Sequence, residues 1–122
     1  MKKQTVGIVG SGHIGGNLGV MLGRAGYKVI FSSRHPEKLV DLARGAGKDA
    51  RTAPIEEAME QGDIVVLSVP LRALPELGSR HAQRLRGKVV LETSNPYPDR
   101  DGDIAVEASQ DRLRIWVDFH PT

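Results

Sequence analysis

Short apolar runs and longer segments with helical spacing alternate along most of the chain. Four apolar runs are typical of strands that are buried in a parallel sheet: residues 5–10, 27–32, 63–69 and 88–93. The intervening segments place apolar residues at helical spacing: residues 13–25, 36–46, 55–60 and 72–86. A short additional strand is predicted near residues 50–51. This alternation predicts an α/β fold, with one doubly wound parallel sheet and helices on both of its faces.

Two of the predicted helices have a face that is defined by apolar residues. In the first helix this face consists of Ile14, Leu18, Met21, Leu22 and Ala25. In the second helix it consists of Leu39, Leu42 and Ala43, after a proline at residue 36 that fits a first helical turn. We expect the fourth helix to be interrupted around Pro75 and Gly78.

The pattern is less regular after residue 93. Residues 94–102 are rich in turn-forming residues and predict a loop, residues 103–109 predict a short helix, and residues 113–118 predict a last strand at the sheet edge. The length of 122 residues suits a single domain.

The first strand breaks into the pattern G-x-G-x-x-G at residues 10–15, and the first helix follows directly. Strand, glycine turn and helix in this order are the context of a dinucleotide-binding motif. Gly10 allows the tight turn, Gly12 allows the backbone to approach a pyrophosphate, and Gly15 allows the helix to lie close to the strand. Free N–H groups near His13 and Ile14 are expected to face the anion. The alternative is a glycine-rich turn that binds nothing.

The end of the second strand indicates which dinucleotide is bound. NAD sites usually have a carboxylate there, whereas residues 32–35 read Ser-Ser-Arg-His and the first carboxylate is Glu37. Arg34 offers a planar set of donors for a 2′-phosphate, and Lys38 adds a positive charge one turn later. This segment therefore favours NADP(H). It also fits an ordinary turn in which Ser33 or His35 caps the helix and the arginine is solvated.

Composition excludes several classes of function. The chain has no cysteine, so it has no disulfide, no thiolate nucleophile and no thiolate metal site. The 17 basic and 15 acidic residues are interspersed, and few aromatic residues occur, which argues against nucleic acid as a partner. No apolar run reaches the ~20 residues of a membrane span, and no signal peptide is evident, so we expect a cytoplasmic protein.

Metal and acid–base chemistry have no clear basis in the sequence. His81 and His120 lack a partner at metal-ligand spacing, so we expect both to be surface histidines. The acidic residues at positions 99, 101 and 103 lack the other ligands of a calcium loop and are expected to be solvated. No catalytic residue and no metal site are predicted.

Several segments together resemble a known family. They are Gly10-Ser11-Gly12-His13-Ile14-Gly15-Gly16, residues 25–29, residues 32–38, Ser68-Val69-Pro70 and residues 93–97. In these positions the chain resembles the NADP-binding domain of the deazaflavin (coenzyme F420)-dependent NADP oxidoreductases, over roughly residues 5–105. This resemblance implies direct hydride transfer between the nicotinamide and a deazaflavin or flavin, so that the protein mainly positions two rings.

The resemblance also implies a set of cofactor-binding residues. The pyrophosphate is expected at Gly10, Ser11, Gly12, His13, Ile14 and Gly15. The 2′-phosphate is expected at Ser32, Ser33, Arg34 and Lys38. The nicotinamide ribose and its pocket are expected at Ser68, Val69, Pro70, Leu71, Asn95 and Pro96.

The predicted function is therefore an NADP(H)-binding oxidoreductase domain of residues 1–122, acting on a small molecule as a homodimer. Residues 111–122 diverge from the family, and its C-terminal helical domain is expected to be absent. One alternative is a non-catalytic NADP(H)-binding module, either a sensor or a partner subunit. Another is an NAD(H)-dependent enzyme that acts on a small carbonyl compound or imine.

Overall fold

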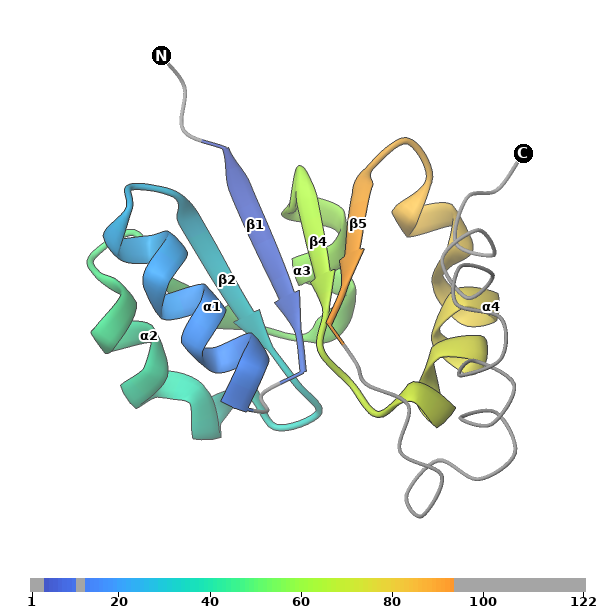
Figure 1. The fold of residues 1–122 in the computed structure, drawn as a ribbon, viewed down its shortest axis with the longest axis horizontal. Coiled ribbons are helices and arrows are strands. Elements are labelled where there is room, and N and C mark those ends of the chain that lie inside the picture. The colour runs from blue at the N-terminus through green and yellow to red at the C-terminus, as the bar shows by residue number, and fades with distance from the viewer. Residues whose placement is uncertain (1–3, 11–12, 94–122) are drawn as a thin grey trace.

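The computed structural model describes residues 4–10 and 13–93, with only the backbone of His13 and Leu71. Five parallel strands form one sheet in the order β3-β2-β1-β4-β5. The strands are β1 (Thr5–Val9), β2 (Lys28–Ser32), β3 (Arg51–Ala53), β4 (Ile64–Leu67) and β5 (Val89–Glu92). Figure 1 shows the helices on the two faces of this sheet, which confirms the predicted doubly wound α/β fold.

One face of the sheet is covered by α1 (His13–Arg24) and α2 (Val40–Ala46), which follows the 3-10 helix η1 (Pro36–Leu39). Their apolar side chains pack against Val6 and Ile8 of β1 and against Val29 and Phe31 of β2. Leu39 and Ala43 are buried and Leu42 is half-buried, as their helical spacing predicts.

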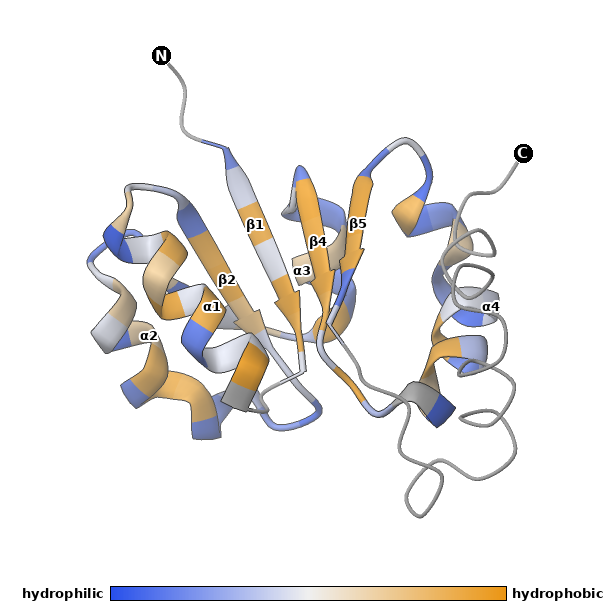
Figure 2. Ribbon diagram, in the orientation of Figure 1, coloured by the Kyte–Doolittle hydropathy of each residue, from blue (hydrophilic) through white to orange (hydrophobic). Residues whose placement is uncertain are grey.

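The other face is covered by α3 (Ile55–Gln61) and α4 (Leu74–Leu85), with the 3-10 helix η2 (Leu71–Ala73) before α4. Met59 of α3 and Leu74 and Leu85 of α4 form a core with Val9, Val65 and Leu67 of the sheet. Figure 2 shows that β4 is hydrophobic along its length, as expected for a strand that is covered on both faces, and Val65, Val66 and Leu67 are fully buried.

The predicted packing face of α1 is confirmed at Leu18 and Leu22, which pack against the core, but is wrong at other positions. Ile14 is 51% exposed and Met21 is 66% exposed, although both were expected to face the core. The helix instead presents glycines to the sheet and to α2: a Cβ on Gly19 would lie 2.3 Å from the Phe31 ring, and one on Gly23 would lie 2.3 Å from the Ala46 carbonyl oxygen. The backbone of α1 therefore approaches its neighbours more closely than apolar side chains allow.

Several element boundaries differ from the prediction. The second helix is divided into η1 and α2, and the strand predicted over residues 63–69 ends at Leu67. The interruption of α4 lies at His81 (φ −119°, ψ 15°) and not around Pro75 and Gly78. Pro75 falls in the first turn, where proline is tolerated. The predicted loop, helix and strand of residues 94–118 lie outside the described residues.

Candidate functional site

The carboxyl ends of four strands form one continuous edge. Three backbone hydrogen bonds extend the sheet beyond the strand ends: Gly10 N to Ser32 O (3.0 Å), Ser68 N to Val9 O (2.7 Å) and Thr93 N to Leu67 O (3.1 Å). The strand order reverses direction at β1, which lies between β2 and β4. In open α/β sheets, ligands bind beyond the carboxyl ends of the strands at such a reversal.

The glycine turn lies directly over the end of β4. Gly10 has φ +105°, a conformation that favours glycine, and a Cβ there would lie 2.1 Å from the Ser68 carbonyl oxygen. A Cβ on Gly15 would lie 2.7 Å from the Ser68 Cβ. Only bare backbone fits at these two positions, so the amino end of α1 is held at the strand reversal. Ser11 and Gly12, predicted to hold a pyrophosphate, lie outside the described residues.

The two serines at the end of β2 are engaged in local hydrogen bonds. The buried Ser32 hydroxyl donates to the carbonyl oxygen of Ile8 (2.7 Å), which ties β2 to β1. The Ser33 hydroxyl accepts a hydrogen bond from the backbone N–H of His35 (2.9 Å). Ser32 therefore supports the strands beneath the edge, whereas the partly exposed Ser33 shapes the turn that leads to Arg34.

Arg34 and Lys38 extend a positive surface beyond this turn. Both side chains are exposed, and neither has a charged partner among the described residues. Glu37, the nearest carboxylate in sequence, lies 3.6 Å from Nδ1 of His35 and pairs with it when the imidazole is protonated. The end of β2 thus offers cations to an anionic group without a competing ion pair on either one.

The residues predicted at the nicotinamide end follow β4. Ser68 and Val69 are half-buried beside the glycine turn, and Pro70 is exposed. The Pro70 carbonyl oxygen accepts a hydrogen bond from Ala73 N (2.8 Å), which turns the chain through η2 into α4. Asn95 and Pro96 lie outside the described residues. Thr93 lies at the same edge, although it is not among the predicted binding residues. It follows an apolar strand directly, and this position is the sequence signal for a residue at the carboxyl edge.

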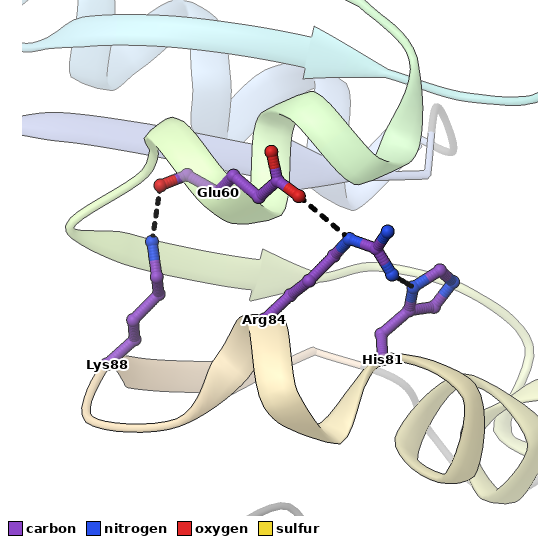
Figure 3. A network of polar contacts seen from close by, with 4 residues as sticks. All are labelled: Glu60, His81, Arg84 and Lys88. Carbon is purple, nitrogen blue, oxygen red and sulfur yellow. Dashed lines mark hydrogen bonds and ion pairs between the residues drawn. The ribbon is translucent and has the colours of Figure 1, made fainter.

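His81 is not the surface histidine that its isolation in the sequence suggested. Only 4% of it is exposed, and its Nδ1 lies 3.1 Å from an Nη1 of Arg84, which also binds Glu60 of α3 (Figure 3). Burial lowers the pKa of His81, and the charge of Arg84 lowers it further. The ring therefore favours its neutral form, in which Nδ1 accepts the hydrogen bond from the guanidinium.

The network around His81 lies away from the carboxyl edge. The ammonium group of Lys88 donates to the carbonyl oxygens of Glu60 (2.7 Å) and Gly62 (2.6 Å), close to the points where β4 and β5 begin. These contacts fasten α4 and β5 to the end of α3.

In the described part of the chain no three potential metal ligands come together, and no helix there is long and apolar enough to cross a membrane.

Comparison with known proteins finds a matching family model and similar proteins. A family model described as "NADP oxidoreductase coenzyme F420-dependent" matches residues 5–96. The chain is 34% identical over 105 residues to an F420-dependent NADP reductase of Methanothermobacter marburgensis, covering 80% of this chain and 46% of the relative. The chain therefore spans about half the length of that relative.

Two solved structures show the same fold. An imine reductase from Pseudomonas sp. has a TM-score of 0.65 at 25% identity and covers 91% of this chain and 39% of its own. An imine reductase from Myxococcus stipitatus in complex with NADP+ has a TM-score of 0.62 at 22% identity and covers 88% of this chain and 37% of its own. The similarity spans most of this chain but well under half of each of these structures.

Proposed function

Because this chain belongs to the family of coenzyme F420-dependent NADP oxidoreductases, we propose that it binds NADP(H) at the carboxyl edge of its sheet. We further propose that it serves hydride transfer between NADPH and a deazaflavin or flavin-like acceptor. Its location in the cytoplasm and its assembly as a homodimer stay predictions from the sequence.

The observation that carries the choice of NADP(H) is the pair of cations that follow β2, neither of which has a charged partner among the described residues. Arg34 and Lys38 are both exposed there, and the closest carboxylate in sequence, Glu37, lies beside His35. A 2′-phosphate gains charge-assisted hydrogen bonds from such a guanidinium, whereas the ribose hydroxyl of NAD(H) gains much less. The bare backbone at Gly10, together with the amino end of α1, supports a diphosphate beside it.

The role of this chain's residues is to bind and orient. NADPH, when bound, supplies the hydride, so the reaction requires no proton donor from the protein at the transferring carbon. Ser68 and Val69 lie beside the glycine turn, where the nicotinamide half of the cofactor would pass over the end of β4.

A binding experiment tests the cofactor assignment. Calorimetric titration of the wild type, Arg34→Ala and Arg44→Ala with NADPH and with NADH should show a selective loss for Arg34→Ala. We expect NADPH binding to weaken by about 1.5–3 kcal/mol, the scale of a hydrogen bond to a charged group, with little change for NADH. Arg44 is the matched control because it is an exposed arginine on α2 with only a surface partner, Asp41. Equal losses for both cofactors would contradict the 2′-phosphate role of Arg34.

A second candidate is a non-catalytic NADP(H)-binding module. It would use the same glycine turn and the same cations, Arg34 and Lys38, without an acceptor beside the nicotinamide. Turnover of NADPH with a deazaflavin, a flavin and a ferric chelate distinguishes the two. Tight NADPH binding without reduction of any acceptor, at any protein concentration, favours the module over the enzyme.

A further inference from the structure

A hydroxyl without a partner lies at the carboxyl edge. Oγ1 of Thr93 is screened from solvent and forms no hydrogen bond, and among the described residues it is the one buried side-chain nitrogen or oxygen atom in that state. A buried polar group without a partner costs on the order of 1–3 kcal/mol, so proteins rarely keep one without a reason.

The position of Thr93 suggests the reason. Its backbone N–H donates to the Leu67 carbonyl oxygen (3.1 Å), which fixes it beside the end of β4 and next to Ser68. Val89 and Leu91 of β5 pair with Ile64 and Val66 of β4, which belong to the face of the sheet that α1 covers. Side chains alternate between the two faces along a strand, so Thr93, two residues after Leu91, lies on the same face. Thr93 therefore lies at the edge that carries the proposed site, on the side of the glycine turn.

The order of the strands decides which part of a dinucleotide reaches Thr93. The proposed 2′-phosphate contacts lie at the end of β2, and the proposed diphosphate contacts lie at the end of β1. A cofactor that follows this order continues over β4 and β5, so its nicotinamide half is the part that comes near Thr93. Ribose hydroxyls and the carboxamide both offer hydrogen-bond partners to a threonine hydroxyl.

We propose that Thr93 is a binding residue for the nicotinamide riboside half of NADP(H), an inference that rests on the proposed function. The residue as a whole is only half-buried, and its hydroxyl can occupy three staggered positions about the Cα–Cβ bond, so we infer that a rotation allows it to meet a ligand at this edge. The hydroxyl, which has no hydrogen-bond partner in the free protein, then forms a hydrogen bond to the ligand.

The test compares two ligands and two variants. Thr93→Val keeps the shape of the side chain and removes the hydroxyl, whereas Thr93→Ser keeps the hydroxyl. Each is titrated calorimetrically with NADP+ and with 2′,5′-ADP, which lacks the nicotinamide half. We expect Thr93→Val to bind NADP+ about five- to tenfold more weakly, the effect of one lost hydrogen bond, and 2′,5′-ADP as the wild type does. Thr93→Ser should bind both ligands like the wild type.

Urea unfolding without ligand separates binding from a structural role. Thr93→Val should be at least as stable as the wild type, because the hydroxyl that it removes has no partner. A loss of stability in Thr93→Val, unchanged NADP+ binding, or equal weakening of both ligands would overturn the role of Thr93. Failure of the wild type to bind either ligand would instead overturn the proposed function.

Discussion

The two longest helices of the described residues, α1 and α4, each have 12 residues but are held in place by different means. α1 lies against its neighbours through glycines, which bring backbone next to backbone or ring. α4 is fastened partly by ionisable side chains, which run from His81 and Arg84 to Glu60 of α3 (Figure 3). The position of α1 therefore depends on atomic volume, whereas that of α4 also depends on charge.

This difference matches what lies at the two helices. The amino end of α1 forms part of the proposed cofactor site, and contacts of fixed volume hold a backbone more rigidly than flexible side chains do. The polar network of α4 lies near the opposite edge of the sheet, where no cofactor is proposed. The comparison predicts that small changes of volume affect α1 and that changes of pH affect α4.

The largest effect is expected from Gly19→Ala. The added Cβ would lie 2.3 Å from a carbon of the Phe31 ring, which is buried, so ring and helix must separate. Overpacking of this kind typically costs 1–3 kcal/mol, and we expect a loss of about 2–3 kcal/mol in the free energy of unfolding, measured in urea.

Gly45→Ala is the matched control for this substitution. Gly45 lies within α2, and a Cβ there meets no atom within 4 Å. Alanine favours a helix by about 0.5–1 kcal/mol over glycine, so this variant should be more stable than the wild type. If both variants gained stability, the close contact between α1 and β2 would not exist in solution.

The sequence predicted the strands and their parallel arrangement well because buried β-branched runs have few alternatives. It placed Leu18 and Leu22 of α1 correctly but Ile14 and Met21 wrongly, since hydrophobic spacing assigns the core face to large apolar residues. Where a helix approaches a sheet closely, the inner positions belong to the smallest residues. The regular spacing of Gly15, Gly19 and Gly23 carries that information.

The candidate site could be predicted only in part. The glycine turn and the cations at the end of β2 follow from sequence order, because strand ends meet at one edge in a parallel sheet. The burial of His81 has a local signal, because helical spacing puts it on one face with the buried Leu74 and Leu85, but the link from Arg84 to Glu60 of another helix could not be predicted. Partners that the fold brings together from distant positions leave no local pattern.

Ser32→Ala tests the strands beneath α1 and should have the next largest effect. The Ser32 hydroxyl is buried and donates to the Ile8 carbonyl oxygen at 2.7 Å. Its removal should cost about 1 kcal/mol in the free energy of unfolding, the typical net value of a hydrogen bond. Ser33→Ala is the exposed-turn control; a larger loss for Ser33→Ala than for Ser32→Ala would contradict the assigned roles.

The pH dependence of stability tests the α4 network. Burial, and then the charge of Arg84, lower the pKa of His81; Glu56 raises it, and Arg80 lowers it. The folded state therefore binds the proton less readily than the unfolded chain, whose histidine has its ordinary pKa of about 6.5. The stabilisation is complete above about pH 6.5 and is lost as the pH falls through the lowered pKa of the folded state.

His81→Gln isolates this contribution. An amide oxygen can still accept a hydrogen bond from Arg84, but glutamine does not titrate. Urea unfolding between pH 7.5 and pH 5, conditions that we choose to bracket the ordinary value, should give a shallower pH dependence for the variant than for the wild type. Identical slopes would show that the neutral ring of His81 does not contribute to the attachment of α4.

The smallest effect is expected where the sheet is least covered. Val89 of β5 is 57% exposed and Leu91 is 48% exposed, on the same face on which Val66 of the neighbouring strand is fully buried. Val89→Thr should change the free energy of unfolding by no more than about 0.5 kcal/mol, as is usual for surface positions. Val66→Thr, the same substitution one strand away, buries a hydroxyl and should cost about 1–3 kcal/mol. Equal losses for the two variants would mean that the β5 face is as well covered in solution as the face beneath α1, and the contrast between the two parts of the sheet would not hold.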